Sequence, residues 1–288
     1  MNQPRWQILV LFVWILAGTA CGVPSNARSV VLPDQKAEKS ASREENDSQA
    51  EVAFAYSNAS GNLLLTLPNT KAASNRSFAR AVCGGGYAVD VKFDAEQKAG
   101  PRFTGHQRAD NFDQDQGLRF AVLNGSVPDE SCLLTSRRYL EAREILPIRQ
   151  GNKPCGPELL AKTPRIARRE IILCRSVASF SGDALFLAVE YAPEGENLLA
   201  AFVVLLGSDA YVQVLPAKRG NDAWRADDNG EFQPEYVTAL FAFRKSDGVF
   251  EVVVRWLGAE GDALRLLRTE SPGVLETVTE AARYTGPS

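Results

Sequence analysis

Histidine is almost absent from the chain: His106 is the single one among 288 residues. One imidazole excludes a metal site built from several histidines and leaves at most one histidine for catalysis. The sequence also lacks the G-x-S-x-G turn of α/β-hydrolases, the phosphate-binding pattern G-x-x-x-x-G-K-[ST] and any C-x-x-C pair. No catalytic signature emerges, so we expect a non-catalytic protein without a cofactor or a metal.

A strong charge of either sign is missing as well. The formal net charge is −3, from 32 basic and 35 acidic residues. A dedicated nucleic-acid binder usually carries a clear positive excess, so nucleic acid is not an expected partner. Hydrophobic residues make up 45% of the chain, which is enough to build a normal core.

The N-terminus carries an apolar segment that is too short to cross a bilayer. Arg5 provides a positive charge, and Ile8–Leu16 is continuously apolar. The whole apolar stretch from Trp6 to Ala20 is about fifteen residues, whereas a membrane span needs roughly twenty. This pattern is typical of a secretory signal peptide over residues 1–20.

Four small or hydroxyl residues, Ala17-Gly18-Thr19-Ala20, stand directly before Cys21. This arrangement resembles the lipobox of bacterial lipoproteins, except that Gly18 stands where that family usually has leucine or another aliphatic residue. The resemblance implies that Cys21 is lipidated on its thiol and becomes the mature N-terminus. Because Gly22 is not aspartate, it also implies the outer membrane, if the organism has one. The alternative is ordinary cleavage nearby, which would give a soluble exported protein.

Residues 21–50 follow the signal peptide without any apolar periodicity. The segment Lys36–Glu51 is rich in Lys, Glu, Ser, Ala, Asn and Gln. Such a composition buries too little apolar surface to offset the entropy of ordering the chain. We therefore expect a disordered tether between the lipidated Cys21 and a folded domain.

The stretch from Glu170 to Thr269 contains short alternating or apolar runs that are separated by turn residues, and it predicts an antiparallel meander. The named strand candidates are Ala184–Tyr191, Leu198–Leu206, Tyr211–Leu215, Tyr236–Phe243, Phe250–Trp256 and Leu264–Arg268. Within the fifth run, Phe250, Val252 and Val254 share one face with Trp256, which we expect in the core. The fold class that this favours is mainly β, forming a sandwich or a barrel with a few short helices.

Residues 51–150 predict a β-rich N-terminal half, and residues 151–288 the meander with a C-terminal helix. A single domain over 51–288 remains the alternative. The strand candidates of the first half are Val52–Tyr56, Leu63–Leu67, Tyr87–Phe93 and Leu118–Leu123. Helical features mark three segments, Ser136–Leu146, Pro157–Lys162 and a C-terminal piece that starts at Ser271-Pro272 with Leu275, Val278 and Ala282 as one stripe.

Without Cys21, the chain has four cysteines, and an even number in an exported protein suggests two disulfides. The local pairing joins Cys83 to Cys132 and Cys155 to Cys174, but the sequence leaves the other two pairings open.

Three surface features could carry a function. His106 could serve a hydrolase, although a loop histidine is the plainer interpretation. The loop Asp110–Gly117 holds three aspartates, but its spacing breaks the calcium-loop rule, which favours a solvated acidic loop. The segment Leu133–Glu170 contains nine basic and four acidic residues and could face anionic envelope components.

These features leave three hypotheses of function. The first is a cell-envelope lipoprotein that acts as a non-catalytic interaction or scaffold module, with the membrane and other envelope components as partners. The second is a small-molecule or lipid carrier whose meander resembles that of lipocalins, which would need a sizeable apolar cavity inside the meander. The third is a hydrolase using His106, which would need a serine and a carboxylate within hydrogen-bond reach.

Overall fold

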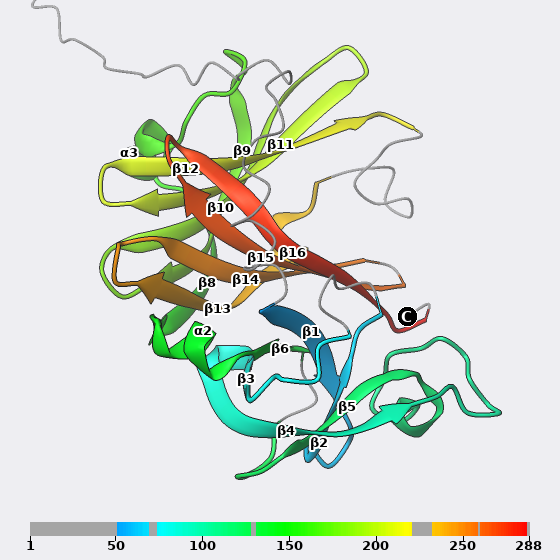
Figure 1. Cartoon of the computed structure of the whole chain (residues 1–288). Coiled ribbons are helices and arrows are strands. Elements are labelled where there is room, and N and C mark those ends of the chain that lie inside the picture. Colours follow the sequence, from blue (N-terminus) through cyan, green and yellow to red (C-terminus); the bar gives the residue numbers. More distant parts are fainter. Residues whose placement is uncertain (1–50, 69–73, 128–130, 221–231, 259, 287–288) are drawn as a thin grey trace, which may run out of the picture.

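The computed structural model describes residues 51–68, 74–127, 131–220, 232–258 and 260–286. These residues form two β-sheets that lie against each other, with short helices at their margins (Figure 1). The mainly β fold class predicted from the sequence is confirmed. Cys21, the signal peptide and the expected tether lie outside the described residues.

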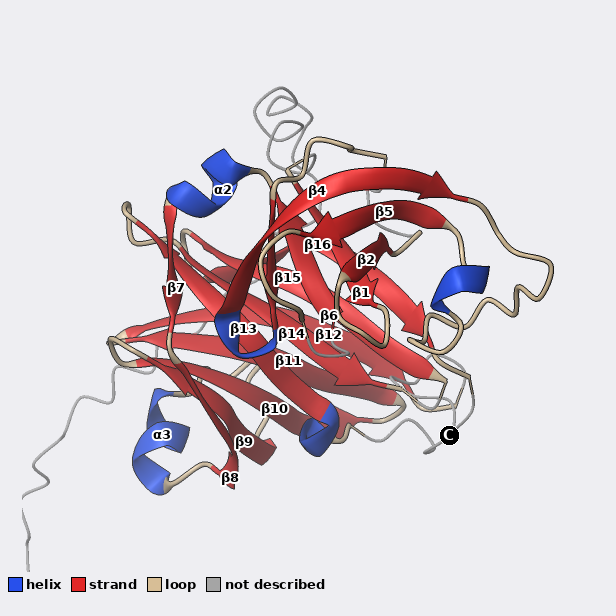
Figure 2. Ribbon diagram, turned by 90° about the horizontal axis from the view of Figure 1, so that it is seen from below, coloured by secondary structure: helices blue, strands red, loops and turns tan. Residues whose placement is uncertain are grey.

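The first sheet is a closed barrel with the strand order β1-β2-β5-β4-β3-β6. Its strands are β1 (Val52–Ser57), β2 (Leu63–Thr66), β3 (Arg80–Cys83), β4 (Tyr87–Gln97), β5 (Gly117–Val122) and β6 (Ser131–Thr135). All neighbouring pairs are antiparallel. Figure 2 shows the long strand β4 and its neighbour β5 curving over β1 and β2.

Strand β1 is buried along its whole length because both of its faces are covered. Ala53 and Ala55 belong to the apolar cluster inside the barrel, where small side chains suit the confined interior. Phe54 and Tyr56 point the other way and pack in the cluster shared with the second sheet. The alternation of small and aromatic residues in this strand therefore reflects two different neighbours.

The second sheet has ten strands in the order β7-β13-β14-β15-β16-β12-β11-β10-β9-β8. The first five strands in chain order are β7 (Arg143–Leu146), β8 (Ile148–Pro154), β9 (Ile171–Phe180), β10 (Ala184–Glu194) and β11 (Asn197–Leu206). The other five are β12 (Asp209–Lys218), β13 (Val237–Lys245), β14 (Phe250–Leu257), β15 (Gly261–Glu270) and β16 (Val274–Tyr284).

This sheet is folded over into two facing layers. Its two edge strands, β7 and β8, are separated along the chain by Pro147 alone, so the ends of the sheet lie next to each other. At the opposite corner, β12 meets β16 through a single parallel pair, Val212 with Val274. One apolar cluster fills the space between the layers, and it includes Phe186, Phe202 and Trp256.

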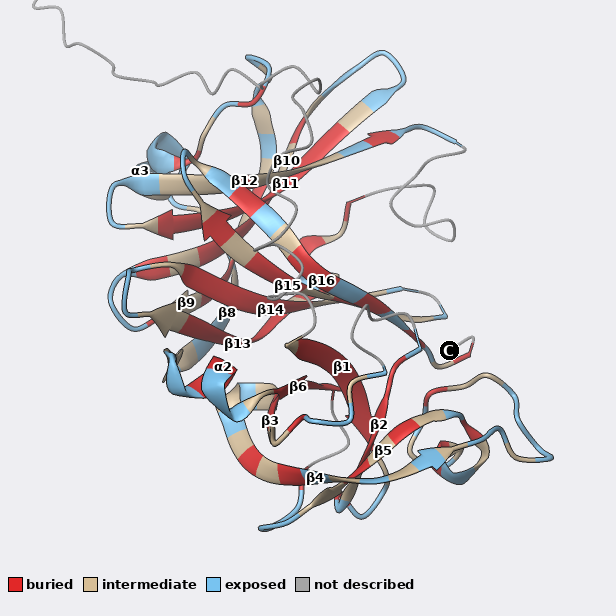
Figure 3. Ribbon diagram, in the orientation of Figure 1, coloured by how far each residue is buried: buried red, intermediate tan, exposed pale blue. Residues whose placement is uncertain are grey.

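The outer faces of the second sheet have two different covers, as the distribution of buried residues shows (Figure 3). Strands β13 to β16 pack on the barrel through a cluster that includes Phe241, Phe243 and Leu264. Strands β9 to β12 are covered by the segment that follows β8, with Ile166 buried against their outer face. Many strands of this sheet are thus buried on both faces, which explains their continuous apolar runs.

The helices of the described residues are all short. They are η1 (Gly84–Gly86), η2 (Phe112–Gln114), α2 (Arg137–Glu141), α3 (Pro157–Lys162) and η3 (Pro234–Tyr236). The helical turn predicted over Pro157–Lys162 is confirmed as α3. The prediction over Ser136–Leu146 holds only for its first half, because the chain continues as β7, which pairs with β13.

The predicted C-terminal helix is wrong: residues Val274–Tyr284 form strand β16, which pairs with β15 along its length. The register shifts next to Val278, and this bulge breaks the two-residue alternation. Leu275 therefore packs between the two layers, whereas Val278 packs against the barrel. The spacing of Leu275 and Val278 resembles a helical stripe because the strand is bulged near Val278 and is covered on one face by the opposite layer and on the other by the barrel.

Candidate functional site

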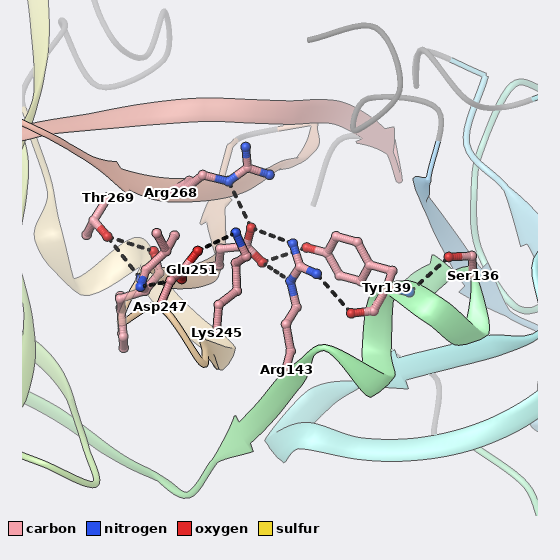
Figure 4. A network of polar contacts seen from close by, with 10 residues as sticks. Ser136, Tyr139, Arg143, Lys245, Asp247, Glu251, Arg268 and Thr269 are labelled. Atoms are coloured by element: carbon pink, nitrogen blue, oxygen red, sulfur yellow. Dashed lines mark hydrogen bonds and ion pairs between the residues drawn. The ribbon is translucent and has the colours of Figure 1, made fainter. Parts of the chain in front are cut away.

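The most elaborate polar site of the described chain surrounds Glu251, a carboxylate that is fully buried between the barrel and the second sheet (Figure 4). Its Oε2 accepts hydrogen bonds from the Tyr139 hydroxyl and from Arg143 Nε, both at 2.7 Å. Its Oε1 accepts from Arg143 Nη2 at 3.1 Å and from Arg268 Nε at 2.9 Å. The carboxylate therefore has four donors from three side chains.

The partners of Glu251 come from elements that the fold holds in place. Tyr139 lies on α2, which begins after Ser136, whose hydroxyl accepts from the Tyr139 amide at 3.0 Å as a helix N-cap. Arg143 lies over the Tyr139 ring at 3.5 Å and donates through Nη1 to the Tyr139 carbonyl at 2.9 Å. Arg268 lies on β15, directly opposite Glu251 of β14.

The charges of this site are mutually stabilising. Burial would raise the pKa of Glu251, but the hydrogen bonds and positive charge of Arg143, followed by Tyr139 and Arg268, hold that pKa below its usual value. Burial and the nearby Glu251 charge raise the pKa of Tyr139 well above its usual value. Burial opposes the charge of Arg143, yet its hydrogen bond with Glu251 keeps the pKa of the guanidinium raised.

This geometry makes Glu251 a structural anchor. A carboxylate held ionised by four donors has no free proton-accepting capacity for catalysis and is already satisfied as an acceptor. The network ties α2, which follows the barrel strand β6, to β7, β14 and β15 of the second sheet. We infer that it fixes the relative position of the two sheets.

The lowered pKa of Glu251 predicts an acid-dependent loss of stability. A carboxyl group whose folded pKa lies below its unfolded pKa stabilises the fold above the unfolded value, about pH 4.3, and loses that contribution as the pH falls through the folded value. We expect the free energy of unfolding to fall more steeply below about pH 4.3 in the wild type than in a Glu251→Gln variant. Urea unfolding between pH 7 and pH 3 measures both slopes, and parallel curves would contradict the expectation.

His106 does not meet the geometry of a catalytic triad. Its imidazole packs against the edge of Tyr284 with the ring centroids 4.9 Å apart. The hydrogen bonds found for this residue use its backbone: its amide donates to Thr104 Oγ1, and its carbonyl accepts from Asn111. Within the described ranges, no serine or carboxylate is hydrogen-bonded to the imidazole, so the structure gives the hydrolase hypothesis no support.

The aspartates of the loop Asp110–Gly117 point to separate partners. Asp110 pairs with Arg108 at 3.1 Å on the surface. Asp115 is buried and accepts a hydrogen bond from the Tyr56 hydroxyl at 2.8 Å. Among the described residues, no group of three or more potential ligands is arranged to hold a metal ion. The loop serves to pack the region of η2 against the barrel through Phe112 and Tyr56.

The four cysteines form the two local disulfides. Cys83 of β3 is bonded to Cys132 of β6 inside the barrel, and Cys155 is bonded to Cys174 of β9 at the margin of the second sheet. The first bond joins β3 and β6, which pair with each other in the closed barrel. The second bond holds in place the segment that covers β9 to β12.

The interior of the second sheet is filled rather than hollow where the structure describes it. Phe186 and Phe202 are completely buried there, and Trp256 lies in the same cluster, as predicted. A cleft of about 680 Å³ lies outside the two layers, between α3 and the turns near Asp183 and Gly207. A carrier with its ligand inside the meander is therefore not favoured by this packing.

The basic segment Leu133–Glu170 does not form one surface. Arg143 is buried and pairs with Glu251. Arg169 is also largely buried and pairs with Glu194. Arg165 and Arg168, by contrast, are exposed beside α3.

No protein-family model, no curated protein and no solved structure matches this chain. No helix in the described ranges combines the length and the apolar character that crossing a membrane requires.

The Glu251 network was not predicted from the sequence, because Glu251 alternates with apolar residues as a solvent-facing residue would. Val253, an apolar residue on the same strand face, is the signal that this face is covered.

Proposed function

We propose that this protein is a cell-envelope lipoprotein, held at the membrane through lipid on Cys21, whose folded part is a non-catalytic interaction or scaffold module. The proposed anchor rests on the N-terminal residues Arg5 to Cys21. The observation that carries the proposal beyond them is the pair of disulfides, because such bonds persist in the oxidising compartments reached by export.

The non-catalytic part of the proposal rests on the polar groups that the fold brings together. Glu251, whose carboxylate accepts four hydrogen bonds, is saturated and buried. His106 contacts Tyr284 instead of a nucleophile. The role that we propose for this two-sheet body is binding to other envelope components.

Radioactive palmitate labelling in the native cells tests the anchor. We expect the wild type to incorporate the label and to sediment with membranes. A Cys21→Ser variant should remain unlabelled, because serine has no thiol to modify. The matched control, Ser25→Ala, changes a nearby residue outside the lipobox-like sequence and should label as the wild type does.

Two outcomes would contradict the proposal. Label that persists in the Cys21→Ser variant would place the lipid elsewhere. An unlabelled wild type in the soluble exported fraction would support ordinary cleavage and a soluble protein.

A further inference from the structure

The second disulfide ties the segment that carries α3 to β9. The Cys155–Cys174 bond ties the end of β8 to β9, and α3 starts at Pro157 directly after it. The loop that follows is fixed by the Tyr191 hydroxyl, which donates to the Pro164 carbonyl at 2.8 Å. We use the name α3 face for the exposed cations and apolar side chains of this region, which are Lys153, Leu160, Lys162, Arg165, Arg168 and Ile172.

The cations of the α3 face are available to a partner. Lys153, Arg165 and Arg168 are exposed, and none of them has an ion pair with another described residue. Lys162 pairs only with Glu158, one helical turn away, whose side chain is 89% exposed. Such an exposed pair is weak and exchanges easily for another anion.

The same region exposes two large apolar side chains. Leu160 of α3 is 38% exposed and Ile172 of β9 is 55% exposed. Ile172 stands where the register shifts between β9 and β10, so a bulge moves it out of the regular ladder. The exposed Glu170 lies two residues before Ile172, so the region is mixed in charge with a positive excess. Exposed apolar side chains near lysine and arginine are typical of surfaces that enter the interfacial region of a bilayer.

The backbone at Ala167 and Arg168 adopts a left-handed conformation that is energetically unfavourable for residues with a β-carbon. Ala167 and Arg168 have φ angles of 50° and 60°, in the left-handed region that residues with a β-carbon rarely occupy. Burial of Ile166 and the ion pair of Arg169 with Glu194 hold the two ends of this turn. The turn thereby presents Arg168 at its tip, and strain of this kind is concentrated at functional positions.

We propose that the α3 face docks on the surface of a bilayer that contains anionic phospholipids, with its cations near the phosphates and Leu160 and Ile172 in the interfacial region. This inference rests on the proposed anchor at Cys21, which would keep the domain close to the bilayer so that a weak contact is enough. The anchor alone would not orient the domain. Docking through the α3 face would turn the barrel, at the opposite end of the molecule, away from the membrane (Figure 1).

Vesicle co-sedimentation of the mature chain without its lipid, residues 22–288, tests the docking separately from the anchor. We expect binding at low salt to vesicles of phosphatidylglycerol with phosphatidylcholine, and none to phosphatidylcholine alone. The double variant Arg165→Gln/Arg168→Gln should bind roughly thirtyfold more weakly, because each cation near an anionic surface contributes about 1 kcal/mol. An Ile172→Ser variant should also bind more weakly.

The matched control is Arg102→Gln/Arg138→Gln, which removes two exposed arginines from other parts of the fold and leaves the same net charge. It should bind as the wild type does. Equal loss in both double variants, equal binding to both kinds of vesicle, or no binding to either would overturn the inference. Binding to an anionic polysaccharide without binding to vesicles would also overturn it. Because no lipid on Cys21 is needed here, a failure of this test leaves the palmitate result standing, and the reverse is equally true.

Discussion

Replacing Glu251 by glutamine is expected to lower the free energy of unfolding by about 3 to 5 kcal/mol, because removing one partner of a buried ion pair leaves uncompensated charge inside the protein. Glutamine preserves the shape but cannot neutralise Arg143, whose side chain is only 8% exposed, or Arg268. Urea unfolding followed by circular dichroism measures the difference.

Glu280→Gln is the matched control for this experiment. Glu280 lies on β16, is 67% exposed and pairs with Arg265 at 3.5 Å, so its loss should change the free energy of unfolding by about 1 kcal/mol or less. If Glu251→Gln were no more harmful than Glu280→Gln, the network would not be the anchor between the two sheets that its geometry suggests.

Removing the disulfide inside the barrel, through Cys83→Ala/Cys132→Ala, should cost about 4 kcal/mol in the chain-entropy model, since it frees a long loop in the unfolded chain. The two cysteines are 49 residues apart and completely buried. The second pair, Cys155 and Cys174, closes a loop of 19 residues, and its removal should cost about 3 kcal/mol.

Thermal unfolding of the two double variants beside the wild type measures this difference. Both melting temperatures should fall, and the loss of the barrel disulfide should have the larger effect. An unchanged melting temperature after loss of the Cys83–Cys132 bond would contradict the account of the barrel core.

Sequence reasoning works best where local signals and packing agree. The hairpin of β11 and β12 is predicted by the apolar run Leu198–Leu206 and the turn at Gly207-Ser208-Asp209, and the structure has it. The apolar face of β14 that ends at Trp256 is likewise buried as expected. In both cases the strand pattern and the turn residues lie within a few positions of each other.

The sequence does not reveal which outer faces acquire a second cover. Glu251 looks like a solvent-facing residue because its strand neighbours alternate, and only the barrel packed over β14 makes it buried. The strand β16 looks helical because the bulge near Val278 shifts its alternation. The missed burial of Glu251 and the wrong C-terminal helix have one physical cause: contacts between elements far apart in the chain override the local pattern.

In the proposed lipoprotein, the second sheet would face the membrane and the barrel would face other envelope components. The α3 face offers cations and two apolar side chains, while the buried network around Glu251 links α2, which follows the last barrel strand, to the second sheet. A module oriented in this way would present the barrel surface to other envelope components. The palmitate and vesicle experiments examine the two halves of this arrangement independently.

Mass spectrometry of the N-terminal peptide from the membrane fraction tests the central claim most directly. After trypsin digestion, the account predicts a peptide that begins at Cys21, ends at Arg28 and carries lipid on its thiol. A peptide with an unmodified Cys21, or a mature chain that begins at another residue, would contradict it.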